Sequence, residues 1–200
     1  MCIRDRRRIG LTGGIASGKT TITNYIRKHK NIPILDADHF SRELIKPNTY
    51  GYKKILDYFG NKIIDNKSNS KREINRKLLR NIIFKHSASK EWIEKLLHPL
   101  IKERMIEECS QYRNNQTIVL VIPLLFEAKF EDICTEIWLV KCPRELQKKR
   151  LIERDKISEK EAYESINLQL TFEEKRKFSD IILDNSDNQN KWIKTIKELL

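Results

Sequence analysis

Short apolar runs alternate with amphipathic stretches along the chain, which is typical of an α/β protein. Apolar residues recur at helical spacing in residues 20–30 and again in residues 190–200. Strands that alternate with helices predict a parallel sheet with right-handed crossovers. Five runs predict the strands of this sheet: residues 9–12, 32–38, 117–125, 136–143 and 179–185. The third run is unbroken and apolar, which predicts a strand buried on both faces.

Two long helical stretches interrupt this alternation. Residues 42–115 are polar and carry no strand pattern, so we interpret them as an inserted helical module that covers a substrate. Residues 144–177 form a second charged helical stretch, which we interpret as a lid. Residues 1–6, MCIRDR, resemble a translated sequencing-library adapter, and we set them aside. We expect a single domain over residues 1–200 whose core comprises about residues 7–41, 116–143 and 178–200.

Composition narrows the class of protein. Lys and Arg number 40 against 28 Asp and Glu, a formal net charge of +12, which fits either a basic surface or a site for polyanions. The four cysteines form no C-x-x-C pair, so we expect a reduced, cytoplasmic protein without a zinc or redox motif. We expect no membrane association, because no apolar run approaches a membrane span and no signal-peptide pattern is present.

Four of the six glycines lie within residues 10–18, where GGIASGKT at residues 13–20 matches G-x-x-x-x-G-K-[ST]. The motif follows a predicted strand and opens a predicted helix, which is the context of a P-loop. Its glycines, Gly13, Gly14 and Gly18, let backbone N–H groups surround phosphate oxygens. We expect Lys19 to reach the β- and γ-phosphates of ATP. Two hydroxyls follow, with Thr20 expected to bind Mg²⁺ and Thr21 the α-phosphate.

The remaining sequence favours a small kinase over other P-loop proteins. It has no N-K-x-D motif for guanine, and the apolar run at residues 117–125 carries no acidic residue before Glu127. Asp36 and Asp38 follow in LDADHF, two residues apart, so on a strand they would face the same side. A carboxylate suits the orientation and deprotonation of an acceptor hydroxyl. We expect Asp38 in that role and Asp36 near the substrate or a Mg²⁺-bound water; the alternative is that Asp38 caps the next helix.

The motifs, taken in order, resemble those of the dephospho-CoA kinase family. The similar segments are IGLTGGIASGKT, DAD, YGYKKILDYFG, INRKLLRNIIF, LLHPLI, VIPLLFE, RLIERD and QLTFEEKRKFSDIILDN, which together span nearly the whole chain. The resemblance implies phosphorylation of the ribose 3′-hydroxyl of dephospho-CoA by ATP, giving CoA and ADP in the last step of coenzyme A biosynthesis. It also implies an α/β P-loop kinase with a five-stranded parallel sheet, an inserted helical acceptor module and a helical lid.

The resemblance also implies roles for single residues. Residues 16–21, among them Ala16 and Ser17, would hold the ATP phosphates, and Asn185 would lie in the adenine loop. Asp38 would be the base. The lid residues Arg150 and Arg154, one helical turn apart, would act with Arg144 on the γ-phosphate; the alternative is a charged face on a surface helix. Four residues would bind the acceptor, each with a purely structural alternative as a helix, turn or loop residue: Arg76, His98, Pro99 and Glu127.

Two departures and two alternatives accompany this interpretation. Ala16 and Asp187 stand where glycine is common in the family, and alanine is acceptable at residue 16 if φ is negative. One alternative is a kinase with another acceptor, such as a nucleoside, a nucleotide or shikimate. The other is a nucleic-acid binder, which the scattered basic residues disfavour. We therefore expect dephospho-CoA and ATP as partners, no specific nucleic acid, and a monomer or weak homo-oligomer.

Overall fold

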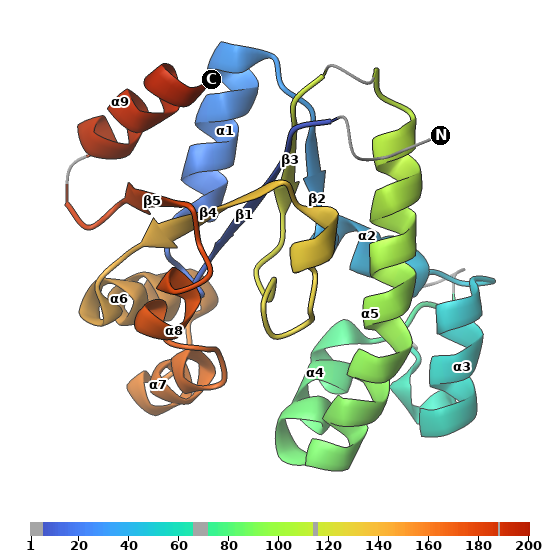
Figure 1. Cartoon of the computed structure of the whole chain (residues 1–200). Coiled ribbons are helices and arrows are strands. Elements are labelled where there is room, and N and C mark those ends of the chain that lie inside the picture. Colours follow the sequence, from blue (N-terminus) through green and yellow to red (C-terminus); the bar gives the residue numbers. More distant parts are fainter. Residues whose placement is uncertain (1–5, 66–71, 114–115, 188) are drawn as a thin grey trace. The chain divides into compact units, whose positions relative to one another are not determined.

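The computed structural model describes residues 6–65, 72–113, 116–187 and 189–200. Its centre is a parallel five-stranded sheet in the order β2-β3-β1-β4-β5 (Figure 1). This confirms the predicted fold class. The strands are β1 (Arg8–Gly13), β2 (Ile34–Asp36), β3 (Ile118–Val121), β4 (Glu136–Lys141) and β5 (Ile181–Asp184).

The chain divides into two compact units, and the first comprises residues 1–36 and 109–200. Side chains of β1, β3, β4 and β5 form its core with the inner faces of α1 and α9. Trp138 from β4 and Trp192 from α9 are the largest side chains buried in this core. The helices of this unit are α1 (Lys19–Lys30), η3 (Glu131–Ile133), α6 (Arg144–Asp155), α7 (Glu159–Asn167), α8 (Phe172–Arg176) and α9 (Gln189–Leu199).

The second unit, residues 37–108, has a core of its own, with Ile55, Ile63 and Leu79 buried together. Side chains of Thr49 and Asn75 cap two of its helices by accepting backbone N–H groups. Its helices are α2 (Ala37–Leu44), α3 (Tyr50–Phe59), η2 (Asn61–Ile63), α4 (Arg76–Lys85) and α5 (Ser87–Ser110), which continues into the first unit. The predicted division into core, acceptor module and lid stays a prediction, because the predicted lid falls within the first unit.

Three local predictions differ from the structure. The run at residues 117–125 forms a strand only as far as Val121, since Pro123 has no N–H to give to the sheet. β2 ends at Asp36 and α2 begins at Ala37, so the prediction that Asp36 and Asp38 share one face of a strand is wrong. The alternative interpretation of His98 and Pro99 as a turn is wrong as well, because α5 continues eleven residues beyond Pro99 to Ser110.

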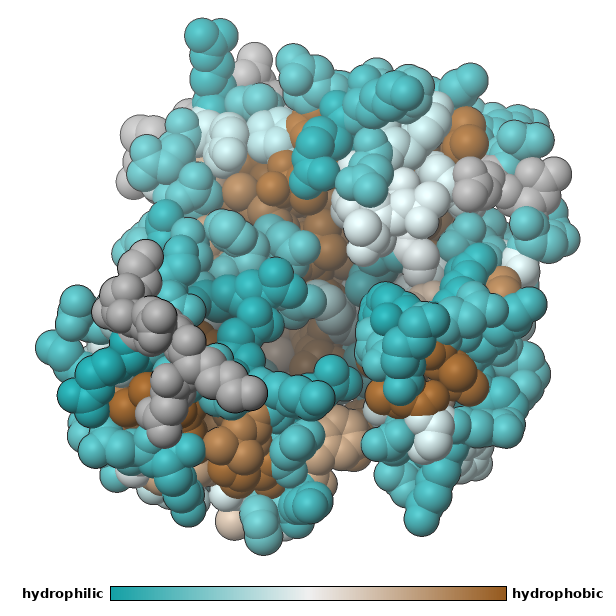
Figure 2. Space-filling view, turned by 180° about the vertical axis from the view of Figure 1, so that it is seen from behind, coloured by the Kyte–Doolittle hydropathy of each residue, from teal (hydrophilic) through white to brown (hydrophobic). Residues whose placement is uncertain are grey.

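The surface agrees with the charged composition, since hydrophilic residues cover most of the face seen in Figure 2. Among the described residues, no helix combines the length and the apolar character needed to cross a bilayer. Arg6 is buried and donates to the carbonyl of Cys109, so the folded part includes one residue of the segment that we set aside. Cys2 lies outside the described residues, and Cys109, Cys134 and Cys142 are free thiols.

Candidate active site

The P-loop joins the end of β1 to the start of α1. Gly13 and Gly18 have φ values of 153° and 100°, in a region that residues with a Cβ rarely adopt. A Cβ added to Gly18 would also lie 2.1 Å from Nδ2 of Asn185, so neither the backbone nor the space admits another residue there. The loop therefore has the close-packed, glycine-dependent shape that the motif predicts.

Ala16 takes an unexpected conformation. Its φ is +56°, which is left-handed, so the condition that φ is negative at this position is not met. A left-handed alanine costs about 1 kcal/mol, because its Cβ crowds the following carbonyl. The surrounding loop compels this conformation, and glycine would adopt it without strain.

The amino end of α1 has the features of an anion site. Gly18 precedes it without a side-chain cap, whereas the residues before α3, α4, α7 and α8 accept a backbone N–H with their side chains. An uncapped amino terminus presents N–H groups and the positive end of the helix dipole. Lys19 Nζ lies over the start of the loop, 2.8 Å from the carbonyl oxygen of Gly13 and 2.9 Å from that of Gly14. The Thr20 side chain is exposed beside it.

The two carboxylates predicted on the acceptor side, Asp36 and Asp38, follow one another at the carboxyl end of β2. Asp36 and Leu11 both pair with Val121 of β3, from opposite sides, so Asp36 lies level with the strand that leads into the P-loop. Two strand spacings separate them, roughly 10 Å. Asp38 is the second residue of α2, where the positive end of the helix dipole stabilises a negative charge. Chain connectivity limits its Cα to about 7 Å from that of Asp36.

The lid arginines lie in different surroundings. Arg150 Nη1 is 3.5 Å from Cys142 Sγ and 3.7 Å from the position that a Cβ on Gly18 would take, which places it beside the P-loop. The Arg154 guanidinium instead pairs with Asp155 at 2.7 Å, and its side chain is 57% exposed. Arg144 donates to the side chain of Asn167 in the lid.

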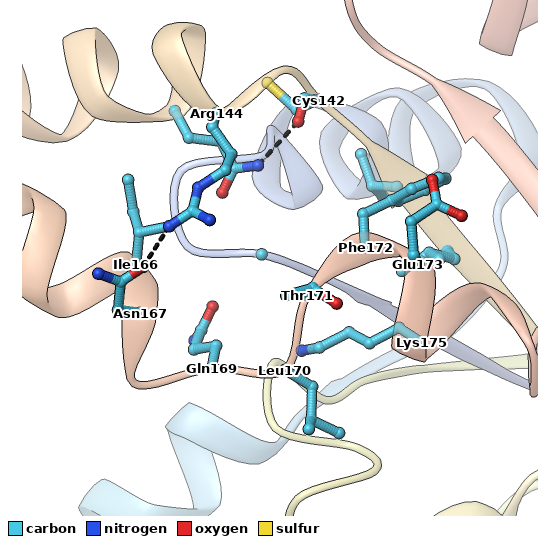
Figure 3. A pocket seen from close by; sticks show the side chains of 14 residues that line it. Cys142, Arg144, Ile166, Asn167, Gln169, Leu170, Thr171, Phe172, Glu173 and Lys175 are labelled. Carbon is cyan, nitrogen blue, oxygen red and sulfur yellow. Dashed lines mark hydrogen bonds between the residues drawn. The ribbon is translucent and has the colours of Figure 1, made fainter.

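A pocket of about 250 Å³ lies between the P-loop at Gly14 and the lid. Figure 3 shows Arg144 and Lys175 entering it from opposite sides. The Lys175 side chain is only 1% exposed and pairs with Glu127 Oε1 at 2.9 Å. That oxygen also accepts the N–H of Leu170 at 3.0 Å. Glu127, predicted to bind the acceptor, is thus engaged by two groups of the lid.

Asn185, predicted in the adenine loop, lies buried behind the P-loop. Its Nδ2 donates to the Ser17 carbonyl at 2.9 Å, and its Oδ1 accepts from Trp192 Nε1 at 3.1 Å. On the opposite flank, the N–H of Ile15 donates to Gln169 Oε1 at 2.7 Å. Sequence reasoning missed Gln169, Gln147 and Lys175, since no local pattern distinguishes them from the other polar residues of the lid.

The remaining predicted site residues belong to the second unit. Arg76 is the first residue of α4, and its side chain is exposed. His98 and Pro99 lie inside α5. Burial lowers the pKa of His98, and Glu94, one turn away, opposes this in part. His98 is therefore held toward its neutral form.

A glycine-rich P-loop at the carboxyl edge of this parallel sheet, with helices α6, α7 and α8 in the same unit, is the architecture of a P-loop kinase. A family model described as dephospho-CoA kinase matches residues 7–191. The chain is 87% identical over 196 residues to the dephospho-CoA kinase of Prochlorococcus marinus (strain MIT 9312), covering 98% of this chain and 96% of that protein. The chain therefore belongs to the dephospho-CoA kinase family, and the predicted family and reaction are confirmed.

Solved structures agree with this assignment. The dephospho-CoA kinase from Campylobacter jejuni superposes with a TM-score of 0.69 at 26% identity, over 97% of both chains. The Thermus thermophilus protein TT1252 gives a TM-score of 0.79 at 25% identity, over 98% of both chains. A shikimate kinase from Acinetobacter baumannii shares the fold alone, with a TM-score of 0.54 at 14% identity. Shikimate as the acceptor therefore gains no support beyond the fold.

Proposed function

We propose that this chain transfers the γ-phosphoryl group of ATP to the ribose 3′-hydroxyl of dephospho-CoA, with the P-loop holding the donor and Asp38 orienting the acceptor. The family match over residues 7–191 is the observation that carries this proposal. Phosphoryl transfer depends on positioning and on the neutralisation of charge, so each residue acts by placing one of the two reactants.

The donor side is supported by the geometry of the P-loop. Backbone N–H groups of Ala16 and of residues 18–20, at the amino end of α1, would hold the phosphates, with Thr21 at the α-phosphate. The Ser17 N–H would keep its bond to the Gly14 carbonyl, at 3.1 Å, and stabilise the turn of the loop. Lys19 would exchange its contacts to the Gly13 and Gly14 carbonyls for phosphate oxygens, which carry full negative charge. Arg150, beside the loop, would neutralise charge that develops during transfer, and Arg154 would join it on release from Asp155.

Magnesium fits the exposed Thr20 hydroxyl in the first turn of α1, directly after Lys19. Thr20 would hold Mg²⁺ beside the phosphates, where the ion would supply charge neutralisation, and Asp36 would orient a water molecule of the ion. One protein hydroxyl beside the phosphates suits this ion, which keeps most of its water ligands.

On the acceptor side, we propose that Asp38 accepts the proton of the 3′-hydroxyl, supported by its place directly after the carboxyl end of β2. Arg76, His98 and Pro99 would bind dephospho-CoA, whose pyrophosphate suits a basic protein with a net charge of +12. We further propose a cytoplasmic enzyme that acts as a monomer or weak homo-oligomer and binds no specific nucleic acid.

The test replaces the P-loop lysine. We expect Lys19→Ala to abolish ADP release with dephospho-CoA while the circular dichroism spectrum stays unchanged, because Lys19 lies partly exposed at the start of α1, where it donates to the carbonyls of Gly13 and Gly14. The matched control is Lys28→Ala, an exposed lysine near the other end of α1. Near-normal turnover by the folded Lys19→Ala protein contradicts the assignment of the donor site.

A further inference from the structure

Three side-chain amides contact the P-loop from outside the phosphate cradle. Gln169 accepts the N–H of Ile15, and Asn185 donates to the carbonyl of Ser17. Gln147 packs against Gly14 so closely that a Cβ there would lie 2.5 Å from its Oε1. They come from α6, from the segment between α7 and α8, and from the residue after β5, so three separate parts of the chain converge on the five residues between β1 and α1.

Two of the amides make a second hydrogen bond, and the third lies next to a residue whose backbone is held. Asn185 Oδ1 accepts from the indole of Trp192, and Gln147 Nε2 donates to the Cys142 carbonyl at 2.8 Å. Gln169 precedes Leu170, whose N–H is fixed by Glu127. The supports are therefore connected to the sheet and to α9 as well as to the loop.

The chemistry of these contacts calls for amides. An indole nitrogen only donates and a carbonyl oxygen only accepts, so a residue between Trp192 and Ser17 must offer an acceptor and a donor at once, as Asn185 does. A carboxylate would place an acceptor against the Ser17 carbonyl and add negative charge next to the triphosphate site. Amides satisfy the backbone without such a charge.

The contacts also leave the cradle available. They use the Gly14 α-carbon, the Ile15 N–H and the Ser17 carbonyl, and so do not take the N–H groups of residues 18–20 that face the phosphates in a P-loop. At the same time they surround Ala16, whose left-handed backbone needs outside support to persist.

We propose that Gln147, Gln169 and Asn185 are positioning residues that hold the P-loop in its phosphate-binding shape before ATP arrives. Such preorganisation lowers the cost of ordering the loop on binding, so its loss weakens ATP binding. The same loss leaves the binding of dephospho-CoA unchanged, because these residues contact only the donor side in this proposal. This inference rests on the ATP-binding function proposed above.

The test is Gln169→Met, which keeps the length of the side chain and removes the acceptor of the Ile15 N–H. Isothermal calorimetry measures the Kd for ATP, and steady-state assays measure KM for each substrate. We expect the Kd and KM for ATP to rise about 3- to 10-fold, the effect of one hydrogen bond. The KM for dephospho-CoA stays within twofold. Asn24→Ala, which removes an exposed amide on α1, is the matched control and leaves all three constants unchanged.

A second variant, Asn185→Asp, sharpens the test because it keeps the acceptor for Trp192 and loses only the donor to Ser17. We expect a rise in the Kd for ATP of at least about tenfold, as repulsion adds to the lost bond. If Gln169→Met binds ATP within twofold of the unmodified protein, or changes KM for both substrates alike, the positioning role is refuted. If the unmodified protein itself takes up no ATP, the proposed function fails instead.

Discussion

The buried pair of Glu127 and Lys175 allows a quantitative prediction about how α8 is held to the segment that follows β3. Lys175 Nζ lies 2.9 Å from Glu127 Oε1, and the two side chains are 1% and 19% exposed. Lys175→Met removes the cation and leaves the largely buried Glu127 carboxylate without it, although the carboxylate still accepts the N–H of Leu170. Removal of one partner of a buried pair costs about 3–5 kcal/mol, and the residual exposure of Glu127 favours the lower figure.

The expected loss is therefore about 3 kcal/mol, or about 6–12 °C in Tm for a chain of this size. In the double variant Glu127→Gln, Lys175→Met no charge remains, and the amide oxygen of the new side chain still accepts the Leu170 N–H. The stability of this variant should return to within about 1 kcal/mol of the original, because well-packed neutral residues replace buried pairs at little cost.

Urea unfolding followed by tryptophan fluorescence measures these values. A Trp92→Phe background leaves Trp138 and Trp192, both in the first unit, as the only reporters. A loss below about 1 kcal/mol for Lys175→Met, or a double variant no more stable than the single one, would refute the reasoning.

Three further predictions concern single residues. Ala16→Gly should raise Tm slightly or leave it unchanged, since relief of the left-handed strain offsets the extra freedom of the unfolded chain; a clear fall in Tm contradicts this. Burial raises the pKa of the Cys134 thiol to about 12 from 9.0, so the unfolded chain loses this proton first and stability falls as pH rises above about 9. Cys134→Ala should lessen that fall by roughly 1 kcal/mol between pH 9 and pH 10 in urea unfolding, and an unchanged slope argues against it. Arg150→Ala should lower kcat by about 100-fold, and Arg154→Ala by less, because only Arg150 lies beside the P-loop; equal kcat losses argue against this.

The sequence supports the fold and the donor site well because their signals are local. A strand, five residues of glycine-rich loop and a helix follow one another within residues 8–30. Phosphate binding requires these three elements in this order, so a short stretch of sequence is enough to predict the site. The unbroken apolar run that begins at Thr117 likewise predicts a strand buried on both faces, and residues 118–121 form the buried strand β3. The family resemblance adds the acceptor, which no local rule specifies.

Distant contacts escaped prediction for a physical reason. Ile15 and Gln169 are 154 residues apart, and Ser17 and Asn185 are 168 residues apart. The sequence around each residue therefore carries no pattern that predicts its partner. The left-handed Ala16 also depends on such contacts rather than on alanine itself. Asp38 was assigned to a strand because β2 is only three residues long, too short for alternation to locate its end.

The central claim is that this chain moves the terminal phosphate of ATP onto dephospho-CoA. Mass spectrometry and ³¹P NMR of the products, with shikimate and nucleosides as parallel acceptors, measure this directly. The account predicts one ADP for each CoA formed, with the new phosphate on the 3′-oxygen and no product from the other acceptors. Transfer to another acceptor with none to dephospho-CoA, or no consumption of ATP at all, would contradict it.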